Sequence, residues 1–317
     1  MAINTLATAT MFQTNLDLLA EQTAKTGYMG LNSNLVKYHG GATVKIPKLS
    51  VNGMGAYDRD EGYVQGGVTL TYGTYEMTQD RGRKFQLDAM DVDENNFVTT
   101  AAAVMGEFQR KKVVPEIDAY RISKLATYAM SNDAAKNSGQ VAYGYTPAAA
   151  TILAKMEDAI KYLRDDCDYD GQIVFHINGD VDNVLKIAAL DKIRNATFSQ
   201  AGINLEVPML DNCPLILTSK KRMYSAITTY DGKTAGQKAG GYVKASSGLD
   251  INFLAVARDT PIAVTKQDKM KIFTPEQNQD ADAWKMNYRR FHELWVLDNQ
   301  VGKIFVNIKD AEPGSDS

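Results

Sequence analysis

Two alternating stretches flank a glycine-rich loop within residues 43–88, which read TVKIPKLSVNGMGAYDRDEGYVQGGVTLTYGTYEMTQDRGRKFQLD. Apolar side chains recur at every second position in both stretches, at Val44, Ile46, Val68, Leu70 and Tyr72. This period is typical of β-strands, and the polar segment 56–67 between them predicts the tip of a long hairpin. Because an isolated two-stranded ribbon is marginally stable in water, we expect this one to lie on a neighbouring chain unless it folds back.

A long helix is predicted after the hairpin. Apolar residues recur at helical spacing before and after Pro115, at Phe97, Ala101, Val104, Met105, Phe108, Ile122, Leu125, Ala126 and Ala129. Since proline lacks the backbone N–H and clashes with the preceding turn, we expect Pro115 to kink or interrupt this helix.

The remaining segments predict an α+β fold. Residues 1–42 read as an arm too short for a core of its own, and residues 146–249 mix amphipathic helices with apolar strands such as Ile173–Ile177. From Ile251 to Ile308 the pattern returns to extended segments.

Composition excludes several classes of protein. The 317 residues are 44% apolar and carry 35 basic against 38 acidic side chains, a formal charge of −3. A protein that binds nucleic acid tightly needs an excess of clustered Lys and Arg. A shell that encloses DNA without binding it tightly does not need this excess of basic residues. Cys167 and Cys213 have no metal-site spacing and give no disulfide framework. We find no signal peptide and no apolar run long enough for a membrane span.

Fragments that resemble active-site motifs each lack a required residue. Gly232-Lys-Thr234 ends like a phosphate loop, but the upstream glycine is replaced by Ile227. Asp166–Gly171 begins like a calcium loop, but Ile177 stands where a bidentate Glu should close it. The three histidines are far apart in the sequence, at His39, His176 and His292. We therefore expect no catalytic, cofactor or metal site, and a protein that is not an enzyme.

Three blocks of sequence resemble one family. They are Asp80–Glu94 (DRGRKFQLDAMDVDE), Val114–Lys124 (VPEIDAYRISK) and a C-terminal block made of Ile272–Pro275, Asp280–Trp284 and Tyr288–Val296. In this order they resemble major capsid proteins of tailed bacteriophages of Gram-positive hosts, which have the Hong Kong 97-like fold. The resemblance spans residues 80–296, and its specificity lies in the order of the blocks because none is a catalytic signature.

The resemblance implies an α+β capsid fold with four parts. They are an N-terminal arm (1–42), an extended hairpin loop (43–88), a peripheral domain with a spine helix and a long sheet (89–145 with 250–317), and an α+β axial domain (146–249). The last strand could join either domain.

The resemblance also implies a function. The chain would be a structural subunit of an icosahedral phage head, assembling into pentamers and hexamers that enclose packaged double-stranded DNA without sequence-specific binding. Its partners would be further copies of itself, a separate scaffolding protein, a portal and possible decoration proteins. It would reside in the virion, and in the host cytoplasm during assembly, without contact to a membrane. The alternative is an encapsulin-like nanocompartment shell that loads protein cargo.

Charged side chains suggest an assembly interface. We hypothesise that the ribbon tip, with Asp58, Arg59, Asp60 and Glu61, forms ion pairs across subunits with Arg81, Arg83 or the pair Arg289 and Arg290. The alternative is a solvated loop whose exposed pairs contribute ~0–1 kcal/mol. The residue types for a lysine–asparagine crosslink are also present, at Lys45, Lys48, Glu293 and Asn299, but the sequence does not bring them together.

Overall fold

The computed structural model describes residues 24–35, 37–38, 43–60, 62–88, 104–189, 191–200 and 203–314. The α-helices are α4 (Val114–Lys136), α5 (Ile152–Lys161) and α6 (Gly179–Ala189). The strands are β1 (Lys37–Tyr38), β2 (Thr43–Val51), β3 (Val68–Glu76), β4 (Gln79–Asp88), β5 (Val141–Ala142), β6 (Ile173–Ile177), β7 (Arg194–Gln200), β8 (Ile203–Leu210), β9 (Cys213–Leu217), β10 (Ile227–Thr229), β11 (Tyr242–Lys244), β12 (Ile251–Ala257), β13 (Ile262–Phe273), β14 (Ala283–Trp295) and β15 (Ile304–Ile308).

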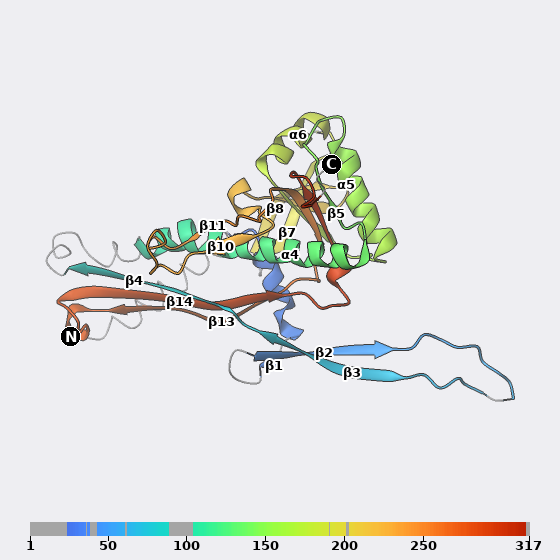
Figure 1. Cartoon of the computed structure of the whole chain (residues 1–317), viewed down its shortest axis with the longest axis horizontal. Helices are drawn as coiled ribbons and strands as arrows, with labels where there is room; N and C mark the ends of the chain where they lie inside the picture. Colours follow the sequence, from blue (N-terminus) through green and yellow to red (C-terminus); the bar gives the residue numbers. More distant parts are fainter. Residues whose placement is uncertain are drawn as a thin grey trace.

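A seven-stranded sheet forms the centre of the main body, in the order β5-β15-β12-β6-β9-β8-β7. Alternate residues of β12 point to opposite faces, so Phe253 and Ala255 pack under α5 and α6 while Leu254 and Val256 pack against α4. Both faces are thus buried, which explains why β6, β12 and β15 are buried throughout their length and each carries only one polar residue. The result is three layers, with α5 and α6 above the sheet and α4 below it (Figure 1).

The long helix continues through Pro115. The turn 104–108 is α-helical, Gln109–Val113 form a π-helical turn, and α4 begins at Val114. Because Pro115 has no N–H to donate, the wider π turn directly before it accommodates the lost hydrogen bond, with the Val114 N–H bonded to the Gln109 carbonyl. The expected interruption is therefore a local change of helix type. The expected start of the helix, at residues 97–103, lies outside the described residues.

A second sheet of three long strands, β13-β14-β4, extends from the main body (Figure 1). Its strands are antiparallel, with Ile262 opposite Trp295 at one end and Ala283 opposite Asp88 at the other. Met105 and Phe108 of the helical segment cover this sheet at Met286 and Tyr288. The helix thus links the two sheets, because its first part packs on the long sheet and its later part packs on the seven-stranded one.

The predicted hairpin forms, but it is shorter than expected. β2 and β3 pair from Thr43 opposite Glu76 to Val51 opposite Val68. Residues 79–88, which we had included in the hairpin loop, instead form β4 and pair with β14. The alternation that marks a strand does not reveal its partner, so the sequence could not separate these two pairings.

The boundaries of the two predicted domains also differ from the observed sheets. We had grouped β12 with the long sheet in 250–317, whereas β12 lies beside β6 at the centre of the seven-stranded sheet. The last strand, β15, joins this sheet as well. In both pairings the partner residues are at least 48 positions apart in the sequence, which local pattern cannot resolve.

The segment just after the N-terminal residues is part of the core. In the 3-10 segment Gly27–Leu35, Tyr28 and Met29 are fully buried against α4 and the sheet. Asp118 of α4 lies directly below and accepts hydrogen bonds from the backbone N–H groups of Lys25 and Thr26 at 3.1–3.2 Å. This segment is therefore fixed to the body, whereas residues 1–23 of the expected arm lie outside the described residues.

Candidate assembly surfaces

The outer half of the β2–β3 ribbon has one apolar face. Residues directly opposite each other in an antiparallel pair point to the same side, and Leu49 faces Leu70 while Val51 faces Val68. These four side chains are 54–70% exposed, and the other side of the ribbon carries Ser50 opposite Thr69. Figure 1 shows that the ribbon stands away from the main body. Within the described part of the chain, its apolar face is thus uncovered.

The base of the same ribbon is anchored. Val44 and Ile46 are buried with Met77 against Ile262 and Trp295, at the junction with the long sheet. The outer part therefore projects from a fixed root.

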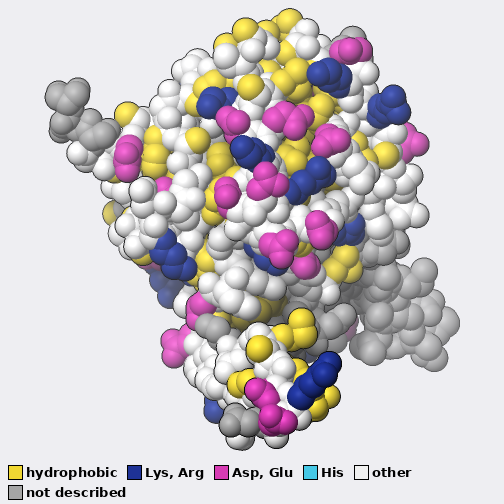
Figure 2. Space-filling view, turned by 90° about the vertical axis from the view of Figure 1, so that its right-hand side faces the viewer, with side chains coloured by type: hydrophobic (Ala, Val, Ile, Leu, Met, Phe, Trp, Pro, Cys, Tyr) yellow, Lys and Arg dark blue, Asp and Glu magenta, His cyan; other side chains and the backbone are white. Residues whose placement is uncertain are grey.

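The ribbon tip is a tight turn with aromatic and acidic side chains. Asp58 and Gly62 exchange backbone hydrogen bonds at 2.8 and 3.1 Å, and Gly62 has a φ of +83°, which favours glycine. The rings of Tyr57 and Tyr63 meet edge to face at 4.9 Å. Seen from the tip end, the ribbon forms a small lobe below the body, on which hydrophobic side chains lie beside acidic and basic ones (Figure 2). Glu61 lies outside the described residues.

Each of the four arginines in our hypothesis has a partner within its own chain. Arg81 donates to Glu116 at 2.6 Å and to the Tyr230 carbonyl at 2.7 Å, and Arg83 donates to the Lys238 carbonyl at 3.1 Å. On β14, two short contacts join Arg289 to Asp80, and Arg290 donates to Asp268 at 2.7 Å. Because β4 and β14 pair, the four arginines lie on neighbouring strands, and the sequence did not reveal their partners within the chain.

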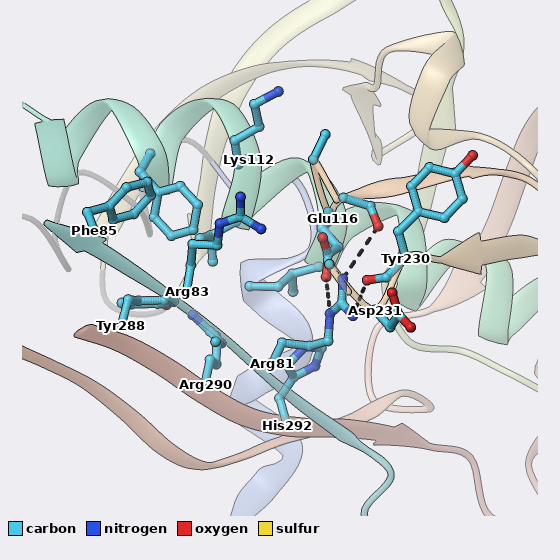
Figure 3. A pocket seen from close by; sticks show the side chains of 18 residues that line it. Arg81, Arg83, Phe85, Lys112, Glu116, Tyr230, Asp231, Tyr288, Arg290 and His292 are labelled. Atoms are coloured by element: carbon cyan, nitrogen blue, oxygen red, sulfur yellow. Dashed lines mark hydrogen bonds and ion pairs between the residues drawn. The ribbon is translucent and has the colours of Figure 1, made fainter. Parts of the chain in front are cut away.

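A pocket of about 210 Å³ lies where β4, the π turn and the glycine-rich loop 230–241 meet. Figure 3 shows Arg81, Arg83, Arg290 and Lys112 around it, together with Glu116. Phe85, Phe108 and Tyr288 supply an apolar wall. Sequence reasoning missed this site, because Lys112 and loop 230–241 are distant from β4 along the chain.

The loop 230–241 is held in place by its own turn. The Asp231 carboxylate accepts bonds from the Thr234 hydroxyl and from the N–H groups of Lys233 and Thr234 at 2.6–2.9 Å. These bonds hold the pKa of Asp231 down, to about 2. The fragment Gly232–Thr234 that resembled a phosphate loop is thus a capped surface turn.

Comparison with known proteins gives a fold but no relative in sequence. No protein-family model and no curated protein matches the chain. Among solved structures, a chain from the mature capsid of bacteriophage PhiM1 matches with a TM-score of 0.51 and 9% identity, over 84% of this chain and 82% of that one. A chain from the capsid of cyanophage P-SCSP1u matches with 0.52 and 10%, over 86% and 84%. A chain of Mycobacterium phage Bobi matches with 0.53 and 11%, over 91% and 92%.

This chain has the tailed-phage capsid fold. The matches cover 84–91% of this chain, so the Hong Kong 97-like α+β architecture expected from the sequence is confirmed. At 8–13% identity, the likeness is one of structure and not of individual residues.

Of the residue types named for a crosslink, Glu293 is held by partners in its own chain. Glu293 is buried and accepts hydrogen bonds from the Thr78 backbone and hydroxyl at 3.1 and 2.6 Å and from the Tyr120 hydroxyl. Lys45 is exposed on the ribbon. The Glu293 carboxylate therefore ties the ribbon root to the helix and to β14.

Two histidines of the capsid fold are buried. His176 lies within 2.9 Å of the Tyr28 hydroxyl, and burial lowers its pKa to about 3. Burial and the nearby Arg290 also lower the pKa of His292. His39 lies outside the described residues. In the described part of the chain, no three His, Cys, Asp or Glu side chains gather as metal ligands, and no helix there has the length and apolarity of a membrane span.

Proposed function

We propose that the chain is the subunit of an icosahedral phage head. The observation that carries this proposal is the ribbon, which projects an apolar face that none of the described residues covers. A monomeric protein rarely exposes a continuous apolar face of this kind. Covering the face in an assembly would remove its apolar area from water and so favour association. The likeness to capsid chains in fold supports the same conclusion.

The mechanism is physical assembly. The ribbon of one subunit lies on the body of the next, and this head-to-tail contact closes into rings of five or six. Each contact is small, but one subunit takes part in several at once, so the shell is held more tightly than any single interface. We assign the axial role around these rings to the three-layer body and the peripheral role to the long sheet with the helical segment that covers it.

The chain encloses packaged double-stranded DNA and assembles on a separate scaffolding protein, with a portal and possible decoration proteins in the finished head. Its formal charge of −3 supports a wall that does not grip DNA. The ion pairs proposed between the ribbon tip and a neighbour fit best where an arginine remains accessible, as at Arg83.

The test is to express the chain alone and with its candidate scaffold, and to examine the products by size-exclusion chromatography and negative-stain electron microscopy. Closed shells or tubes of five- and six-membered rings are expected. A small monodisperse species under both conditions would refute the proposal. Shells that form but contain protein cargo, with no nuclease-protected DNA from infected cells, would identify a nanocompartment instead.

A further inference from the structure

The pocket between β4, the π turn and loop 230–241 carries an excess of positive charge. Four cationic side chains line it and only two acidic ones, Glu116 and Asp231. Both carboxylates are already engaged, Glu116 by Arg81 at 2.6 Å and Asp231 by its own turn. Two positive charges in the pocket are therefore left without a compensating anion.

The uncompensated groups are Arg83 and Lys112. Arg83 donates only to a backbone carbonyl, that of Lys238, and the Lys112 ammonium has no partner among the residues that the structure describes. Gly232 and Gly240 border the Arg83 guanidinium, where an added Cβ would lie 3.3 and 3.5 Å from Nη1. The loop thus leaves space around this charge.

Two buried nitrogen atoms at the same pocket also lack partners in the described part of the chain. They are Nδ1 of His292, whose side chain is 3% exposed, and Nε of Arg290. Both atoms lie inside the pocket wall and are closed to an incoming group. A ligand would instead meet the exposed side chains of Arg83 and Lys112.

The wall of Phe85, Phe108 and Tyr288 restricts the ligand further. A bare inorganic anion gains nothing from an aromatic wall, because its hydration is lost without apolar contact in return. The pocket therefore suits an anionic group attached to an apolar or aromatic part.

The ribbon tip has this chemistry. Asp60 is exposed beside Tyr57 and Tyr63, of which Tyr63 is 90% exposed. Counting Glu61 and Asp58, the tip carries three acidic residues and one basic residue, Arg59. In Figure 1 the ribbon extends to the right, whereas β4, β10 and β11, which border the pocket, lie to the left, so we infer that the tip reaches this pocket in another copy.

We propose that the pocket receives the ribbon tip of a second copy, with the Asp60 carboxylate between Arg83 and Lys112 and a tip tyrosine against the aromatic wall. This inference rests on the proposed shell function and names the site at which the ribbon ends. It excludes Arg289 from the contact, since Asp80 already holds that guanidinium at 2.5–2.8 Å.

Charge exchange tests the contact in the full chain. Asp60→Arg and Arg83→Asp are each expected to slow shell formation, followed by light scattering, by at least about tenfold, equivalent to ~1.4 kcal/mol. The double variant Asp60→Arg with Arg83→Asp restores opposite charges and should recover to within about threefold of the parent. Lys111→Asp is the matched control, because Lys111 lies on the same π turn but outside the pocket and pairs with Glu107.

The outcomes separate the two proposals. If the parent chain forms no shells, the proposed function fails. If the parent assembles and the double variant is no faster than the single ones, only the tip-in-pocket inference fails. Circular dichroism of the unassembled subunits checks folding, and Lys112→Asp replaces Arg83→Asp if the latter unfolds.

A direct measurement completes the test. Asp60→Cys with Lys112→Cys should give a ladder of disulfide-linked chains in assembled shells on non-reducing gels, and Asp60→Cys with Lys111→Cys should not. Equal ladders from both pairs, or none from either, would overturn the inference.

Discussion

The apolar face of the ribbon should control assembly without contributing to the stability of the single subunit. We consider the double variant Leu49→Ser with Leu70→Ser, which removes one cross-strand pair from this face. The two side chains are 63% and 54% exposed in the single chain. Since full burial of a leucine contributes ~1.5–3 kcal/mol, covering the exposed part of each contributes about 1–2 kcal/mol to the contact.

The two substitutions together should thus weaken each contact of the ribbon with a neighbour by ~2–4 kcal/mol. This corresponds to a rise of about 30- to 1000-fold in the subunit concentration needed for assembly. The assay is the critical concentration for shell formation, measured by light scattering and sedimentation. The unfolding free energy of the isolated subunit, from urea denaturation, should change by less than about 1 kcal/mol because only a cross-strand contact on an exposed ribbon is lost.

The matched control is Ser50→Ala with Thr69→Ala, the neighbouring pair on the opposite side of the same ribbon. It should leave the critical concentration within about threefold of the parent, a change of under 1 kcal/mol. An unchanged critical concentration for the serine variant would refute the reasoning. So would an equal loss in the control, because that would trace the effect to a loosened ribbon and not to the apolar face.

Three further predictions concern the body of the subunit. Asp118→Ala should lower the unfolding free energy, measured by urea denaturation, by ~3–5 kcal/mol, because it removes the buried partner of Arg222. The control Asp158→Ala removes an exposed partner of Lys155 and should cost under about 1 kcal/mol. A loss below ~1 kcal/mol for Asp118→Ala would contradict this prediction. The pKa of His176 in the folded state, about 3, lies below the ordinary value of 6.5, so between pH 6.5 and 3 the unfolded chain binds one more proton than the folded chain. Stability is therefore lost as pH falls from 6.5 towards 3, by up to ~1.4 kcal/mol per pH unit. His176→Gln should reduce the slope of unfolding free energy against pH by about one proton, and an unchanged slope would refute the assignment. Gly248→Ala should lower the melting temperature, because the added Cβ would lie 2.5 Å from a backbone carbonyl oxygen. The control Gly179→Ala adds a Cβ with no atom within 4 Å and should leave the melting temperature unchanged. Equal melting temperatures for the two variants would contradict the steric argument.

The sequence was sufficient for features whose evidence is local. The alternation around Val44 and Leu70 predicted the ribbon, and the 3.6-residue spacing of Ile122, Leu125 and Ala129 predicted the helix. The order of these elements then indicated the capsid fold. Each depends on neighbours in the chain, which is why single-sequence patterns are informative there.

Non-local pairings were beyond these patterns. The hairpin of β7 and β8 was missed, and β12 was assigned to the wrong sheet, since a strand with apolar residues on both faces fits any buried position. At the candidate site, we predicted Arg81 as a partner of the ribbon tip, but Arg81 pairs with Glu116 on α4 within its own chain. Lys112 gave no signal of a site, because a short basic run such as Arg110–Lys112 is ordinary on the surface of a helix.

The two surfaces of the ribbon have different physical roles. The apolar face supplies free energy but little specificity, since any apolar surface could cover Leu49 and Leu70, and an exposed ribbon edge invites wrong pairings. A charged tip that fits one cationic pocket adds the discrimination, because an unmatched carboxylate against another apolar surface would be desolvated without a partner. In the shell that we propose, the apolar face would therefore determine how strongly a subunit binds its neighbour, and the tip with Asp60 would determine where it binds.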